Sequence, residues 1–107
     1  MGVPEIGVKD LKKLRDAKAP VLLLDVREKD EFAHCRIDGS VLIPLSEFQQ
    51  RFSELPKDKP IVVHCHHGGR SARAAGFLLS QGYKDVKNLA GGIDAWSLEV
   101  DSSVPRY

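Results

Sequence analysis

The stretch I-V-V-H-C-H-H-G-G-R-S-A-R-A-A-G-F-L-L, residues 61–79, decides the fold expected for this chain. An apolar run ends at His64 and Cys65, a short turn with two glycines follows, and small or apolar residues then recur at helical spacing. The pattern predicts a strand, a tight loop and a helix that opens at Arg70 and Ser71. A thiol at the end of such a strand lies inside a ring of backbone N–H groups, beside a helix N-terminus.

Cys65 is therefore the candidate nucleophile. The pKa of a free thiol is about 8.5, and lowering it to roughly 7 requires about 2 kcal/mol of preferential thiolate stabilisation. An exposed helix terminus supplies only about 0.3–1 kcal/mol. Direct contacts with loop N–H groups must supply the remainder, and Gly68 and Gly69 permit the positive φ and close backbone approach that such contacts need. Arg70 adds a fixed charge beside the pocket.

The pattern Cys65-x-x-Gly68-x-Arg70-Ser71 resembles the active-site loop of the rhodanese family, sulfurtransferases that carry sulfur as a cysteine persulfide. The nearest rival is the signature of protein tyrosine phosphatases, which places five residues between cysteine and arginine because its loop encloses a phosphate. Here four residues separate Cys65 from Arg70. The smaller ring suits a single sulfur atom carried on the cysteine.

Blocks along nearly the whole chain resemble the same family, namely residues 24–28, 31–32, 37–40, 43–44, 82–83, 86 and 89–96. Residues 35–37 and 100–107 look closer still to one subgroup, the rhodanese half of adenylyltransferases that activate ubiquitin-like sulfur carriers for molybdopterin or thiamine synthesis. Two features depart from these patterns. Asp38 stands where the family usually has proline, and the adenylyltransferase half is absent.

Length and composition predict one domain spanning residues 1–107, with 42% hydrophobic residues to form its core. The net charge of +1 argues against nucleic acid as a partner. No apolar run approaches the roughly 20 residues that cross a bilayer, and no secretory signal is visible. Two cysteines make no disulfide framework, so we expect a cytoplasmic protein.

Apolar runs alternate with helical patterns throughout the chain. Strands are expected at residues 21–24, 41–43, 61–63 and 84–88, and helices at 8–17, 28–33, 47–55 with Ser46 as N-cap, from 70 onward, and in a short last segment around residues 93–96. This alternation predicts an α/β fold with a central mainly parallel sheet flanked by helices, which the resemblance specifies as a rhodanese-like three-layer domain. Asp25 and Cys65 both fall at carboxyl ends of strands, where such sheets bind ligands.

The candidate site residues take three roles. Cys65 is the catalytic nucleophile, and Asp25 and Arg27 support the site by pairing with loop or helix-end groups. The substrate-binding residues supply N–H groups to the sulfur and orient the donor: His66, His67, Gly68, Gly69, Arg70 and Ser71.

Four further side chains are read as structural. His64 points along a buried strand and is expected to be a hydrogen-bonded core histidine. Cys35 is expected to be a packed, inert thiol, with a resolving thiol as the sharper alternative. Arg73 is expected on a solvated helix face. Residues 64–67 lack the spacing of a zinc site, so no metal is expected.

The resemblance implies a sulfurtransferase that moves sulfane sulfur from a donor such as thiosulfate to a nucleophilic acceptor through a persulfide on Cys65, without a cofactor. The expected partners are a small anionic sulfur donor and, in the cell, a cysteine desulfurase or a ubiquitin-like sulfur carrier protein. Two alternatives stay open: a phosphatase or arsenate reductase on the same fold, and a binding module of a sulfur relay.

Overall fold

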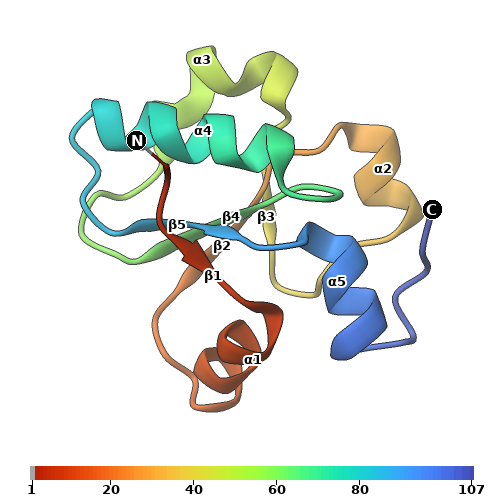
Figure 1. The fold of residues 1–107 in the computed structure, drawn as a ribbon. Coiled ribbons are helices and arrows are strands. Elements are labelled where there is room, and N and C mark those ends of the chain that lie inside the picture. The colour runs from red at the N-terminus through yellow and green to blue at the C-terminus, as the bar shows by residue number, and fades with distance from the viewer. Residues whose placement is uncertain (1) are drawn as a thin grey trace.

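A five-stranded parallel sheet lies at the centre of the part of the chain that the computed structural model describes, residues 2–107 (Figure 1). Its strands are β1 (Glu5–Ile6), β2 (Leu22–Asp25), β3 (Val41–Leu42), β4 (Ile61–His64) and β5 (Val86–Leu89), in the order β1-β5-β4-β2-β3. All their pairings are parallel, which confirms the predicted α/β class. The pattern does not predict β1, because two residues between Pro4 and Gly7 show no alternation.

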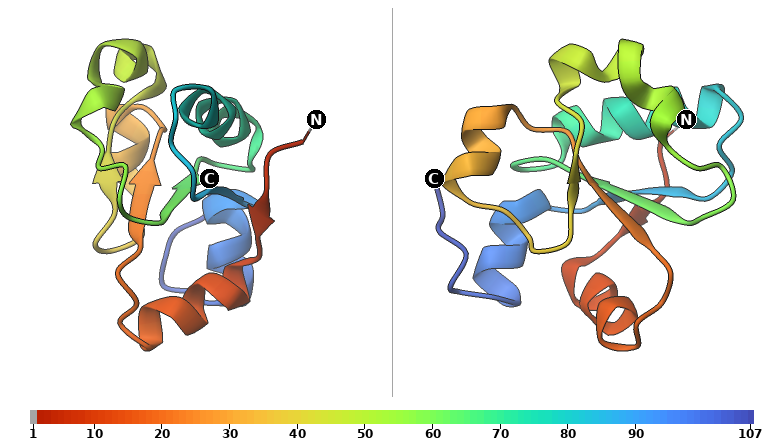
Figure 2. Two further views of the ribbon diagram at one scale, coloured as in Figure 1. Left: turned by 90° about the vertical axis from the view of Figure 1, so that its left-hand side faces the viewer. Right: turned by 180° about the vertical axis from the view of Figure 1, so that it is seen from behind.

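Helices cover both faces of the sheet and give the predicted three layers (Figures 1 and 2). One face carries α1 (Val8–Asp16) and α5 (Gly92–Glu99), and the other carries α3 (Phe48–Arg51) and α4 (Gly69–Ser80). The remaining helix, α2 (Lys29–His34), follows the carboxyl end of β2 and lies beside the C-terminus of the chain.

The central strands are buried on both faces, as their continuous apolar runs predict. In β4, Ile61 and Val63 enter the core beneath α4, whereas Val62 enters the core that contains α1 and α5. In β2, Leu24 and Leu23 divide between the same two cores. Packing on both faces therefore fixes the carboxyl ends of β2 and β4, where Asp25 and Cys65 lie.

The segment after Pro44 differs from its prediction. In place of one helix over residues 47–55, the chain forms a 3₁₀ turn η1 (Leu45–Glu47), the single turn α3 and a second 3₁₀ turn η2 (Phe52–Glu54). Ser46 is not an N-cap, because its hydroxyl donates to Glu28 Oε1 at 2.7 Å. The aromatic residues of the segment still pack inward, with Phe52 edge-on to Phe77 at a ring distance of 4.9 Å.

Asp25 and Arg27 form a buried ion pair just beyond β2, with both side chains 0% exposed. Arg27 donates to Asp25 through Nη2 at 2.7 Å and Nε at 3.0 Å, and its backbone N–H adds a third bond at 2.9 Å. Arg27 Nη2 also donates to the carbonyl of Cys35, the C-cap of α2, at 2.7 Å. The pair thus joins the end of β2 to the end of α2.

Replacing Asp25 with alanine should cost about 3–5 kcal/mol of unfolding free energy, because the Arg27 charge would stay buried without a partner. Urea denaturation would measure the loss. The matched control is Asp16→Ala, which breaks the exposed Lys12–Asp16 pair and should cost less than about 1 kcal/mol. A loss of similar size in the two variants would contradict this account.

Candidate active site

Cys65 lies at the end of β4 in a loop that leads directly into α4, and it is 1% exposed. Three donors converge on its Sγ: the Gly68 N–H at 3.2 Å, the Ser71 N–H at 3.4 Å and the Ser71 hydroxyl at 3.3 Å. Gly68 has a φ of 124°, a conformation that favours glycine and turns its N–H toward the sulfur. Gly69 has no such requirement, since a Cβ there would meet nothing within 4 Å.

These hydrogen bonds control the ionisation of the thiol. Burial raises the pKa of Cys65, but bonds from the Ser71 hydroxyl and from the N–H groups of Ser71, Gly68 and His67 outweigh it and hold the pKa below its ordinary value. The stabilising groups are mostly backbone amides, so the thiolate depends on the shape of the loop.

The N-terminus of α5 holds the loop from outside. The N–H of Ile93 donates to the carbonyl of Cys65 at 2.9 Å, and the N–H of Asp94 donates to the carbonyl of His66 at 3.1 Å. Because these carbonyls face α5, the N–H groups of the same two peptide units, those of His66 and His67, point to the inside of the loop. Gly92, with a φ of 60°, makes the approach possible, since a Cβ there would lie 2.5 Å from both carbonyl oxygens.

Asn88 of β5 supports the loop from below, a role that the sequence pattern did not reveal. Its Nδ2 donates to the carbonyl of Gly68 at 3.2 Å, and its Oδ1 accepts from the Ser71 hydroxyl. A hydroxyl has one hydrogen, so Ser71 donates either to Asn88 or to the Cys65 sulfur. The sequence offers only a weak signal, an asparagine at the end of the strand expected at residues 84–88.

Arg70 is held by a residue that was not predicted to belong to the site. Its guanidinium donates to both carboxylate oxygens of Glu31, at 2.7 and 2.9 Å. Hydrogen bonding by Arg70 lowers the pKa of Glu31 to about 2, against the opposing effect of burial. Glu31 comes from α2, so the pair connects the first turns of two helices.

His66, His67 and Tyr107 form a stack beside the loop. The His66 ring lies 4.0 Å from the His67 ring and 3.9 Å from the Tyr107 ring. The Tyr107 hydroxyl donates to Glu31 at 2.7 Å and accepts from Arg27 Nη1 at 3.0 Å. Burial lowers the pKa of His66, which favours its neutral form. Tyr107 thus brings the C-terminal segment of the chain into contact with the loop, which the sequence pattern did not predict.

His66, His67 and Asp94 bring potential metal-ligating atoms within 4.8 Å of one another. The two imidazoles are stacked at an interplanar angle of 17°, so their ring-plane lone pairs do not converge on one point. Asp94 is paired with Arg106 at 2.9 Å. This arrangement suits a metal ion poorly, and the absence of a metal stays a prediction.

His64 is buried as expected, but the expected hydrogen bond is wrong. Among residues 2–107, neither ring nitrogen has a hydrogen-bond partner, and Nε2 lies 3.8 Å from Asp25 Oδ2. Burial lowers its pKa to about 4, so the ring is neutral at physiological pH. Cys35 is a buried free thiol whose Sγ accepts from Arg27 Nη1 at 3.7 Å.

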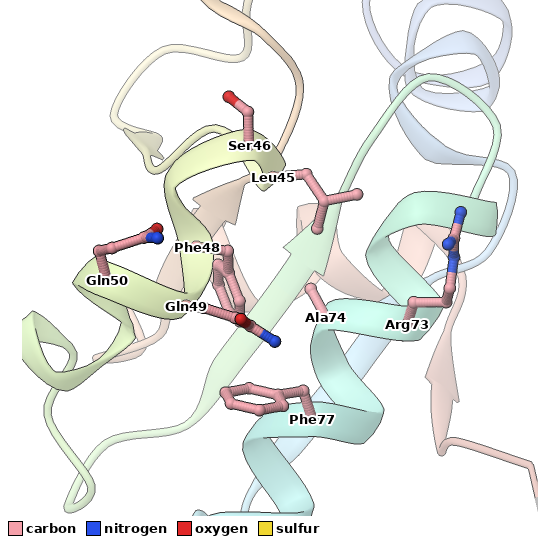
Figure 3. A pocket seen from close by; sticks show the side chains of 8 residues that line it. All are labelled: Leu45, Ser46, Phe48, Gln49, Gln50, Arg73, Ala74 and Phe77. Carbon is pink, nitrogen blue, oxygen red and sulfur yellow. The ribbon is translucent and has the colours of Figure 1, made fainter.

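A groove of about 280 Å³ runs between η1–α3 and α4 (Figure 3). Phe48 and Phe77 line its floor, Gln49 projects into it, and Arg73 stands on the first turns of α4. Arg73 is exposed, as its position on a solvated face predicts.

Comparison with known proteins gives the family. A sequence model described as the Rhodanese-like domain matches residues 7–99. The chain belongs to the rhodanese family. A sulfurtransferase of Allochromatium vinosum is 39% identical to it over 89% of each chain. The rhodanese-related protein of Thermoplasma volcanium has a crystal structure that superposes with a TM-score of 0.81 at 36% identity, covering 91% of this chain and 93% of that one.

Similar proteins also include a member of the predicted subgroup, the adenylyltransferases with a rhodanese half. The maize protein called adenylyltransferase and sulfurtransferase MOCS3-2 is 35% identical over 95% of this rhodanese domain, which spans 23% of the maize protein. Several other curated relatives are longer as well, and the chain spans 38–59% of their length. Across residues 2–107, no helix has the length and apolar character to cross a membrane.

Two glycines of the site should respond differently to alanine. Gly92→Ala should destabilise the protein by about 2 kcal/mol or more and raise the thiol pKa, because its Cβ would push the Cys65 and His66 carbonyls out of place. Gly69→Ala, at the start of α4, should leave both nearly unchanged. Thermal denaturation and the pH dependence of alkylation would measure the effects. Equal losses in the two variants would refute the role of Gly92.

Ser71→Ala should raise the Cys65 pKa by less than about one unit, since the hydroxyl is lost while the Gly68 and Ser71 N–H groups remain. The midpoint of the iodoacetamide alkylation rate against pH should therefore move upward. Arg73→Ala is the control on the same helix and should leave the midpoint in place. A downward shift in Ser71→Ala would show that the hydroxyl does not stabilise the thiolate.

Proposed function

We propose that this rhodanese transfers sulfane sulfur through a persulfide on Cys65, from a donor such as thiosulfate to a nucleophilic acceptor. The proposal rests chiefly on the N–H groups of Gly68 and Ser71, which donate to Cys65 Sγ at 3.2 and 3.4 Å, with the Ser71 hydroxyl as a third donor within reach of the sulfur. The family is one of sulfurtransferases, and this convergence provides the chemistry that a nucleophilic thiol needs.

In the first step, the Cys65 thiolate attacks the outer sulfur of the donor. A new S–S bond forms at Sγ, and the donor's own bond to that sulfur breaks with its electron pair on the leaving group, which is sulfite when thiosulfate is the donor. The N–H groups of Gly68 and Ser71 stabilise the thiolate before attack and the terminal sulfur anion afterwards. Both states carry one negative charge, so the same ring of amides serves both.

In the second step, the acceptor attacks the outer sulfur, and the Cys65 thiolate leaves. Cyanide serves as the acceptor in an assay and becomes thiocyanate, whereas a thiol becomes a persulfide. No further oxidant or reductant is consumed, because in both transfers the attacking nucleophile supplies the electron pair of the new bond and the leaving group takes the pair of the broken bond. We therefore expect no metal or organic cofactor.

In the cell, a cysteine desulfurase is a candidate donor and a ubiquitin-like sulfur carrier protein a candidate acceptor. The similarity to the maize adenylyltransferase and sulfurtransferase supports such a relay. We propose that the relay operates in the cytoplasm, where thiols stay reduced. The phosphatase alternative has less support, because four residues between Cys65 and Arg70 make a ring smaller than phosphate requires.

Cys65→Ser should abolish sulfur transfer from thiosulfate to cyanide and should leave the fold intact, since serine is nearly isosteric. Mass spectrometry of wild-type protein purified without reductant should show an adduct of about 32 Da, one sulfur atom, on Cys65. Cys35→Ser is the matched control and should keep most of the activity. The reverse result, with Cys35→Ser inactive and Cys65→Ser active, would refute the assignment.

A further inference from the structure

Arg70, the cation beside Cys65, is already neutralised by an ion pair with Glu31. Glu31 accepts from Arg70 through both carboxylate oxygens, and each oxygen has a second donor. Oε1 also accepts from the Glu28 N–H at 3.1 Å, and Oε2 from the Tyr107 hydroxyl at 2.7 Å. A bidentate pair of this kind uses two of the guanidinium's N–H groups and offsets its charge.

The position of Glu31 is fixed as firmly as its charge. It occupies the third position of α2, where its side chain completes a capping box with Glu28. Its side chain is 18% exposed, and its pKa of about 2 keeps it ionised at neutral pH. An anion approaching Arg70 would therefore meet a carboxylate on the same guanidinium.

Two other cations near the loop are also paired. Arg27 is bound to Asp25 in the core, and Arg106 is bound to Asp94. Arg73 is exposed and lines the groove between α3 and α4. The N–H donors on Cys65 Sγ can hold the single charge of one sulfur atom. A second charge on the donor, outside that ring, meets at Arg70 a cation that already has a carboxylate partner.

We propose that Glu31 sets the donor class of the Cys65 site: by neutralising Arg70 it disfavours the dianion thiosulfate and favours the persulfide of a thiol. This inference rests on the proposed persulfide function and narrows its donor. A thiol persulfide places its reacting sulfur in the N–H ring, and its leaving group is a thiolate with one charge. Thiosulfate needs a cation to stabilise its leaving sulfite. The cation that the loop provides is Arg70, and Glu31 already binds it.

The reaction with such a donor is balanced without another reactant. The Cys65 thiolate bonds to the outer sulfur of R–S–SH, the donor S–S bond breaks, and its electron pair leaves on R–S⁻. The outer sulfur and its proton pass together to Cys65. The leaving thiolate then takes a proton from water.

The test compares two donors on two variants of equal net charge. Glu31→Gln keeps an oxygen for the Glu28 N–H, because glutamine also completes a capping box. Asp16→Asn removes one negative charge from α1, on the other face of the sheet. Formation of the Cys65 persulfide from thiosulfate and from the persulfide of 2-mercaptoethanol would be followed by rapid-quench mass spectrometry at about pH 8, where an ordinary imidazole is neutral.

Glu31→Gln should raise the second-order rate constant for thiosulfate about tenfold and change that for the mercaptoethanol persulfide less than about twofold. The gain should shrink at high salt, and it should vanish in an Arg70→Gln background because it acts through that guanidinium. Asp16→Asn should leave the rate constants for both donors unchanged.

Three results with the single variants would overturn the inference: no gain with thiosulfate in Glu31→Gln, an equal gain with both donors, or an equal gain in Asp16→Asn. These results differ from failure of the proposed function, in which the wild-type protein would acquire no sulfur on Cys65 from either donor. A gain that persisted without Arg70 would also refute the proposed route.

Discussion

The contact between the first amides of α5 and the loop carbonyls of Cys65 and His66 is the constraint on which the active site depends. A peptide unit points its carbonyl and its N–H in opposite directions. Fixing these two carbonyls outward therefore turns the N–H groups of His66 and His67 inward, and the His67 N–H is one of the groups that lower the pKa of Cys65. Gly92 is the residue that allows the two segments to meet. The hydrogen-bonding environment of the sulfur thus depends on the absence of a side chain at Gly92, a residue that does not itself contact the sulfur.

Around this loop, several polar groups have partners from other elements, although ring nitrogens of His64 and His66 have none among the described residues. Asn88 satisfies Gly68 and Ser71, Glu31 satisfies Arg70, and Asp25 satisfies Arg27. Such matching keeps buried polar groups from destabilising the fold. It also leaves the sulfur as a centre whose charge is stabilised by dipoles, which suits a reaction that passes one negative charge between sulfur atoms.

The parts of this site that depend on local sequence could be predicted. Cys65, the turn at Gly68 and the helix after it all lie within one short segment, and strand ends in parallel sheets locate ligand sites. Glu31, Asn88 and Tyr107 could not be assigned, because each reaches the loop from a distant segment through tertiary packing. The prediction of Ser46 as an N-cap was wrong for the same reason, because its hydroxyl donates to Glu28, a residue of a distant segment.

The distance in sequence between Cys65 and its supports has a consequence for biosynthesis. Glu5 precedes the loop and bonds to Asn88, and the amides of Ile93 and Asp94 are made well after Cys65 itself. Chains are synthesised from the N-terminus, so a nascent chain that ends before α5 contains the cysteine without the groups that shape its surroundings. The loop around Cys65 can therefore reach the geometry described here only after α5 has been synthesised.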